Sequence, residues 1–175
     1  MNLWYHSSMK MRFNIKKKHW SKASEKLVTK AIRYAAYRYG IQDIDLVVKL
    51  GNPNDEYWGF SDFDNKFKIW LYPSDNTRGI LRTVFHEMTH IKQFFYGELD
   101  LDRSIPRWKG KKCGANYKDQ PWEQEAHEME VVLLKEFLDI QVDLVIDEMN
   151  KTMAIQTDTE CKKTEFIQSL LPINL

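Results

Sequence analysis

The feature that most constrains this chain is the stretch Phe85-His86-Glu87-Met88-Thr89-His90, which lies inside a segment with helical periodicity. Apolar residues recur three or four positions apart on both sides of it, at Ile80, Val84, Ile91 and Phe95. Asn76 or Thr77 can cap the start, and Gly97 lies where a helix would end with a left-handed residue. The pattern predicts a helix of about twenty residues with this motif in its middle.

The motif reads His-Glu-x-x-His, a pattern typical of zinc sites. Residues four apart project from one face of a helix, so His86 and His90 can bind the same metal ion. Glu87 is rotated by about 100° from His86, which directs its carboxylate toward a water on the open side of the ion. Chance spacing on an exposed face is the alternative. The flanking apolar residues favour a half-buried face, where two unpaired imidazoles would be costly.

Length and composition predict a single domain spanning residues 1–175, because the chain is 43% hydrophobic and 13% aromatic. Lys and Arg (26) nearly balance Asp and Glu (25), which gives no general attraction to nucleic acid or to an anionic membrane. Cys113 and Cys161 have no Cys-x-x-Cys partner and are expected to be free thiols. We see no signal peptide and no membrane span, and we expect a cytoplasmic protein.

The remaining pattern predicts an α+β fold. An N-terminal arm (1–20) is either a strand or a loose segment, and its basic cluster Lys16–His19 is expected to be a solvated surface run rather than a nucleic-acid site. A helix follows from Ser21 to Gly40. Three strands are expected at 44–50, 57–60 and 67–71. Lysines alternate along the third of these strands, which suggests a sheet edge.

After Gly97 the chain reads as a long irregular loop (98–120), then a helix from Pro121, and finally a C-terminal tail (151–175). A catalytic zinc site needs three protein ligands, and the start of this last helix offers Glu123, Glu125 and His127. Glu123 and Glu125 flank the apolar stripe on opposite sides, so periodicity does not choose between them. Carboxylates there also have a simpler explanation, since they complement the helix dipole.

Two blocks resemble a known group, the small glutamate-type zincins. The segment His86–Leu99 is similar to the active-site helix of phage and bacterial metallopeptidases, and Pro121-Trp-Glu-Gln-Glu-Ala126 is similar to their Pro-Trp-Glu-x-Glu-Ala block. The strands that end at 67–71 also fit, so the resemblance covers residues 40–138. It implies a minimal zincin-like domain with an N-terminal helix, a small twisted sheet of about three strands, an active-site helix and a C-terminal helix that bears the glutamate.

In the related ImmA/IrrE-type peptidases the third ligand is the first residue of Glu-x-x-Ala. The resemblance therefore implies Glu123, with Ala126 as the small residue, as the third zinc ligand. Some members carry an aspartate four residues after this glutamate to orient a metal-bound histidine. This chain has His127 there, and Glu130 is the substitute that we consider.

The implied activity is that of a zinc metallopeptidase, with Glu87 as general base and a peptide or protein as substrate. Tyr117, in the loop before the last helix, is the hydroxyl best placed by sequence to stabilise an oxyanion. The substrate would pair with the strand Phe67–Leu71 as an added β-strand.

Two other classes of protein fit part of the pattern. A SprT-like DNA-associated protease shares the first motif but is usually completed by a third histidine soon afterward, and none follows His90 before His127. A non-enzymatic phage-type protein could keep the metal fold to bind a partner. Glu87 argues against this, because a purely structural metal site has no use for a base.

Overall fold

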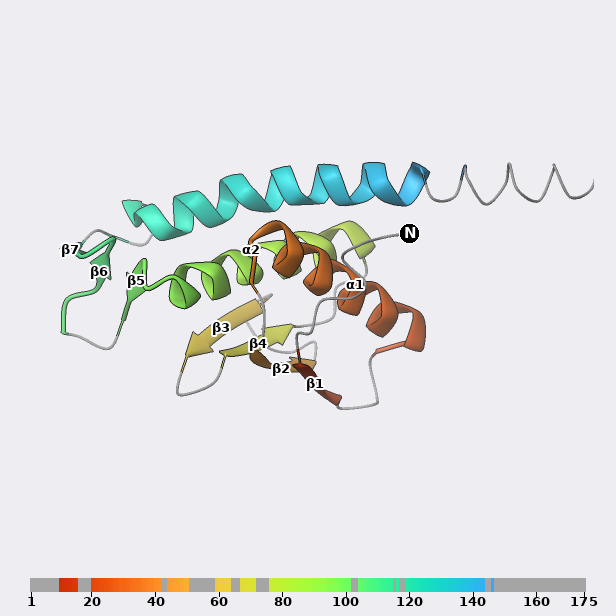
Figure 1. Ribbon diagram of the computed structural model, residues 1–175, viewed down its shortest axis with the longest axis horizontal. Helices are drawn as coiled ribbons and strands as arrows, with labels where there is room; N and C mark the ends of the chain where they lie inside the picture. Colours follow the sequence, from red (N-terminus) through yellow and green to blue (C-terminus); the bar gives the residue numbers. More distant parts are fainter. Residues whose placement is uncertain are drawn as a thin grey trace, which may run out of the picture. The chain divides into compact units, whose positions relative to one another are not determined.

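The computed structural model describes residues 10–15, 20–41, 44–50, 59–63, 67–71, 76–101, 104–114, 116, 119–143 and 146. The chain divides into two compact units, Met1–Lys135 and Glu136–Leu175. The elements discussed below lie in the first unit (Figure 1). Among the described residues, no helix is both long enough and apolar enough to cross a membrane.

The first unit is an α+β structure, as the sequence predicts. Its elements in chain order are β1 (Lys10–Ile15), α1 (Lys22–Arg38), β2 (Asp45–Leu50), β3 (Gly59–Phe63), β4 (Phe67–Leu71), α2 (Thr77–Phe95), β5 (Leu99–Asp100), β6 (Arg107–Trp108) and β7 (Lys111–Lys112). A further helix covers residues 121–143, of which 121–135 belong to this unit. We call it the glutamate helix.

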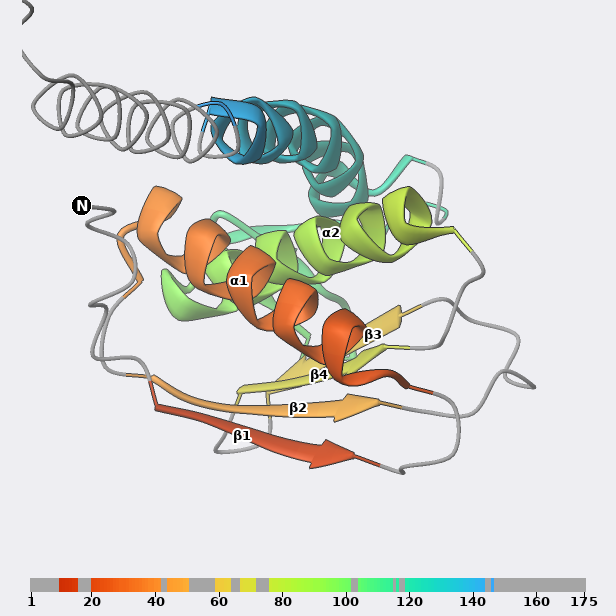
Figure 2. The same cartoon turned by 90° about the vertical axis from the view of Figure 1, so that its right-hand side faces the viewer.

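The main sheet has four strands in the order β1-β2-β4-β3. Strands β1, β2 and β4 are parallel, and β3 is antiparallel to β4. The sequence predicts about three strands, and the additional one is β1, the part of the N-terminal arm that pairs with β2. Both α1 and α2 lie on one face of the sheet (Figure 2). Alternate residues of β2 are buried under them, as its period predicts: Leu46, Val48 and Leu50.

The prediction that Phe67–Leu71 forms an edge strand is wrong. This strand, β4, lies between β2 and β3 and pairs with both. Its alternation has another cause: Ile69 and Leu71 are buried, whereas Lys68 and Trp70, at the alternate positions, point to the other face of the sheet and are partly exposed. Lys49 packs over the ring of Trp70 on that face, with its Nζ 4.7 Å from the ring centroid. The lysines therefore mark a solvated face and not an edge.

Helix ends match the predicted capping residues. The side chain of Ser21 accepts a hydrogen bond from the backbone of Ser24, and that of Asn76 accepts one from Arg78. Gly40 and Gly97 follow the helix ends with φ of 65° and 64°, a left-handed conformation that glycine adopts without strain. Local chemistry thus fixes the length of α2, with the His-Glu-x-x-His motif near its middle.

Helices α1 and α2 pack against each other through apolar and aromatic side chains. The rings of Tyr34 and Phe85 meet edge to face with centroids 6.2 Å apart, an arrangement that aromatic pairs prefer. The hydroxyls of Tyr39 and Thr89 are hydrogen-bonded at 2.7 Å. This contact buries one face of α2, and the two histidines lie on an adjacent face, rotated by about 100°, toward the glutamate helix.

The segment 98–120, predicted as an irregular loop, holds the three-stranded sheet β5-β6-β7 among its described residues. Each strand has only two residues, which is too short to produce a periodic signal. Cys113, in the same segment, is a free thiol as predicted, and Cys161 lies outside the described residues. The glutamate helix begins at Pro121 as predicted.

Candidate metal centre

The motif helix brings the two histidines together as its spacing predicts. The Nε2 atoms of His86 and His90 are 3.2 Å apart, and the rings are nearly perpendicular with centroids at 4.8 Å. His90 is buried and His86 is nearly so. Both histidines therefore present a ring nitrogen to the same small volume.

Glu123 reaches the same volume from the glutamate helix. Its carboxylate oxygens lie 3.4 Å from His86 Nε2 and 3.4 Å from His90 Nε2. The neighbouring side chains Trp122 and Ala126 are buried, and the small side chain of Ala126 lets the glutamate helix approach its neighbours closely. His86, His90 and Glu123 form a group that could hold a metal ion.

The spacing of these three donors fits a small tetrahedral ion. Donors placed tetrahedrally at about 2.0–2.2 Å from zinc are about 3.3–3.6 Å from one another. The two Nε2 atoms are 3.2 Å apart, and each of them lies 3.4 Å from a different oxygen of the Glu123 carboxylate, which are distances close to this range. Two imidazoles and one carboxylate are also a donor set that zinc accepts in catalytic sites, with one position left open. The residues present therefore fit the metal that the motif implies.

Glu87 is buried beside the two histidines. Burial raises the pKa of its carboxyl, and this effect outweighs the opposing influence of His90, His86 and a hydrogen bond from Ser61. Burial lowers the pKa of His86, but the nearby carboxylates of Glu123 and Glu130 and the charge of Glu87 outweigh it and raise the value to about 9. The cluster is thus an electronegative pocket that favours a positive charge.

Glu125, the alternative third ligand, lies in different surroundings. Its carboxylate accepts hydrogen bonds from Lys92 Nζ at 3.3 Å and from Gln93 Nε2 at 2.8 Å, and Lys109 Nζ lies 3.7 Å away. Burial raises its pKa, but the hydrogen bond from Gln93 and the charge of Lys92 outweigh burial and lower it. The structure thus brings Glu123, and not Glu125, to the histidine pair.

A second group that could hold a metal ion shares His86 and adds His127 and Glu130. Glu130 Oε2 lies 3.4 Å from His86 Nδ1 and 3.8 Å from His127 Nδ1. Arg82 donates to the other oxygen of Glu130, so the protein already compensates that charge. His86 Nδ1 is buried and makes no well-formed hydrogen bond, and His127 is 60% exposed. This arrangement suits orientation of His86 better than binding of a second ion.

Three residues of these surroundings were not predicted from the sequence: Arg82, Lys92 and Gln93. Gln93 follows His90 by three positions and Arg82 precedes His86 by four, which are the spacings of neighbours on a helix surface. This spacing is the sequence signal from which Gln93 and Arg82 could have been predicted. Tyr117, predicted as an oxyanion donor, lies outside the described residues.

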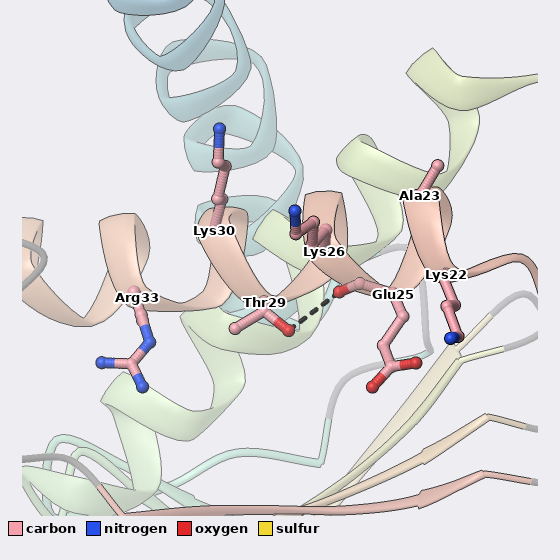
Figure 3. A pocket seen from close by; sticks show the side chains of 7 residues that line it. All are labelled: Lys22, Ala23, Glu25, Lys26, Thr29, Lys30 and Arg33. Atoms are coloured by element: carbon pink, nitrogen blue, oxygen red, sulfur yellow. Dashed lines mark hydrogen bonds between the residues drawn. The ribbon is translucent and has the colours of Figure 1, made fainter.

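A hollow of about 850 Å³ lies along α1, lined by Lys22, Ala23, Glu25, Lys26, Thr29, Lys30 and Arg33 (Figure 3). None of these residues belongs to the histidine and glutamate cluster. One side-chain interaction is drawn within the set, the hydrogen bond from Thr29 to the backbone oxygen of Glu25 at 2.8 Å. The hollow is therefore separate from the metal chemistry.

Comparison of the chain with protein-family models, with curated proteins and with solved structures finds no significant match. The class of protein is therefore defined by geometry alone. It is an α+β protein whose described part carries a possible metal site, built from two histidines of one helix and a glutamate of another.

Proposed function

We propose that this protein is a zinc-dependent peptidase. The observation that carries the proposal is the group of two imidazoles and one carboxylate that could hold a metal ion, with the buried carboxyl of Glu87 beside them. The resemblance of the two motif blocks to glutamate-type zincins points to the same chemistry. His86, His90 and Glu123 would hold the ion, and a bound zinc ion would acidify a water molecule and polarise a substrate carbonyl.

Glu87 is the general base in this proposal. Its carboxylate accepts a proton from the attacking water and returns it to the nitrogen of the leaving amine as the peptide bond breaks. The raised pKa of this buried group supports the role, because a carboxyl that ionises closer to neutrality can both accept a proton and give it back. In a purely structural metal site, burying this additional carboxyl would destabilise the fold and serve no purpose.

The correction to the sheet order changes where a substrate would pair. Strand β3 is bonded to β4 on one side, and no other described strand pairs with its second side. Ser61 of β3 lies within hydrogen-bonding reach of Glu87. A peptide added along β3 would therefore pass beside the general base, with its backbone hydrogen-bonded to the strand.

The test uses the wild type, Glu87→Gln and the control Glu128→Gln. Glu128 is an exposed acid of the glutamate helix outside the cluster. Each protein is loaded with zinc, its metal content is measured, and hydrolysis of a library of unstructured peptides is followed by mass spectrometry. We expect Glu87→Gln to retain zinc and to lose activity by at least about 100-fold, because an amide cannot accept the proton.

Glu128→Gln should cleave like the wild type. Unchanged turnover in Glu87→Gln would refute the role of base. Stoichiometric zinc in the wild type without hydrolysis of any peptide in the library would favour the non-enzymatic alternative.

A further inference from the structure

Gln93 occupies an unusual position for a glutamine. It is fully buried, and it lies between His90 of its own helix and the first turn of the glutamate helix. Its Oε1 is 2.8 Å from His90 Nδ1. Its Nε2 donates to the backbone oxygen of Trp122 at 2.9 Å and to Glu125 Oε2 at 2.8 Å.

The partners fix the direction of this amide. A backbone carbonyl and an ionised carboxylate can only accept hydrogen bonds, so each of them uses one of the two protons on Nε2. Rotating the amide by 180° would turn Oε1 toward two acceptors and remove both of these hydrogen bonds in a buried place. Oε1 must therefore face His90.

The direction of the amide in turn fixes the tautomer of His90. Oε1 can only accept, so the proton of the imidazole must lie on Nδ1. In the neutral ring the lone pair is then on Nε2, the atom that lies 3.4 Å from Glu123 and 3.2 Å from His86 Nε2. This is the form that a metal ligand needs.

Glu125 is held in place for this task. Lys92 contacts both of its oxygens, at 3.3 and 3.4 Å, and also pairs with Glu98. Lys109 lies 3.7 Å from the same carboxylate. These cations hold the carboxylate where it accepts the hydrogen bond from Gln93 Nε2.

We propose that Gln93 is a positioning residue that sets the tautomer of His90 and ties it to the backbone next to Glu123, with Glu125 orienting Gln93. The inference rests on the proposed metal site. It gives Glu125 a role that the sequence does not suggest. It also explains how ligands from two helices keep their separation, because the Trp122 carbonyl bound by Gln93 directly precedes Glu123 in the chain.

The first test needs no metal and no variant. In metal-free protein labelled with ¹⁵N, the long-range proton–nitrogen spectrum distinguishes the two tautomers of each histidine. We expect His90 to carry its proton on Nδ1. A proton on Nε2 would overturn the proposal whether or not the protein is a peptidase, which separates this result from failure of the proposed function.

The second test compares Gln93→Met with the control Gln124→Met, whose side chain is exposed on the glutamate helix. Gln93→Met keeps the length of the side chain and removes all three hydrogen bonds. We expect zinc affinity, measured by competition with a chelator, to fall about 10- to 100-fold, the range typical for loss of such an outer partner. The visible spectrum of the cobalt-loaded variant should change as well.

Gln124→Met should leave both the affinity and the spectrum unchanged. An affinity of Gln93→Met within twofold of the wild type, with the His90 tautomer unaltered, would contradict the proposal.

A charge exchange keeps the test decisive if Gln93→Met does not fold. Gln93→Glu alone places two carboxylates against each other and should weaken zinc binding. Adding Glu125→Gln restores a donor: the new amide can donate to the new carboxylate, which still accepts from His90 Nδ1. We expect the double variant to recover at least tenfold of the affinity lost in the single variant. No recovery would mean that Gln93 acts only by filling space.

Discussion

Glu123 and Glu125 stand two positions apart on the same helix, yet they lie in two different regions of the protein. Glu123 faces two imidazoles, which carry no permanent charge. Glu125 faces Lys92 and Lys109, which do. In the second region the carboxylate pairs with lysine cations, whereas in the first it lies with two imidazoles around a point where an ion fits. The comparison shows that the residues that face a glutamate, more than the glutamate itself, decide whether it can be a metal ligand or belongs to an ion-pair network.

The largest expected effect comes from removing a histidine. His86→Ala or His90→Ala leaves two of the three donors, and we expect zinc to be lost during chelator dialysis that the wild type survives with about one zinc per chain. His127→Ala is the matched control, because this imidazole lies 60% exposed on the far side of His86. Retention of stoichiometric zinc by the double variant lacking both motif histidines would place the metal elsewhere.

The next effect separates the two regions directly. Glu123→Gln removes a charged donor, and its cost in zinc affinity should exceed the roughly 10- to 100-fold that loss of an outer partner causes. Glu125→Gln keeps an acceptor oxygen for Gln93 and should cost less than about tenfold. Competition with a chromogenic chelator measures both. Equal losses in the two variants, or a larger loss in Glu125→Gln, would reverse the assignment.

A smaller effect is expected from the spacing between the helices. Ala126 is completely buried, and Ala126→Leu should push the glutamate helix outward at a cost of about 1–3 kcal/mol in the free energy of unfolding. Zinc affinity should fall together with stability, since Glu123 moves away from the histidines. Val131→Leu, at a position 57% exposed on the same helix, should change stability by less than about 0.5 kcal/mol. Urea titrations with and without zinc give both quantities, and an unaltered affinity in Ala126→Leu would show that close packing there is not required.

The motif helix could be predicted because its signals are local. Asn76 and Gly97 mark its ends, and the apolar stripe fixes its period. Proximity of His86 and His90 follows from the helix geometry alone. The start of the glutamate helix at Pro121 is equally local, and it was predicted at the correct residue.

The rest depends on contacts between distant segments. Periodicity places Glu123 and Glu125 symmetrically, and only the residues that α2 presents, two imidazoles in one case and Lys92 in the other, tell them apart. The prediction that β4 is an edge strand was wrong for the same reason. Nothing in β4 itself reveals that the preceding strand β3 pairs along its outer side, so the alternating lysines of a solvated face gave a wrong prediction of a sheet edge. The implied role of Tyr117 remains a prediction.

The most direct test of the account is a crystal structure of the zinc-loaded protein with anomalous data collected on both sides of the zinc absorption edge. The account predicts one ion at about 2.0–2.2 Å from His86 Nε2, His90 Nε2 and a carboxylate oxygen of Glu123. It also predicts that Glu125 remains bonded to Lys92 and Gln93. An ion bound by Glu125, or one held by His86 Nδ1, His127 and Glu130 with Glu123 remote, would contradict it.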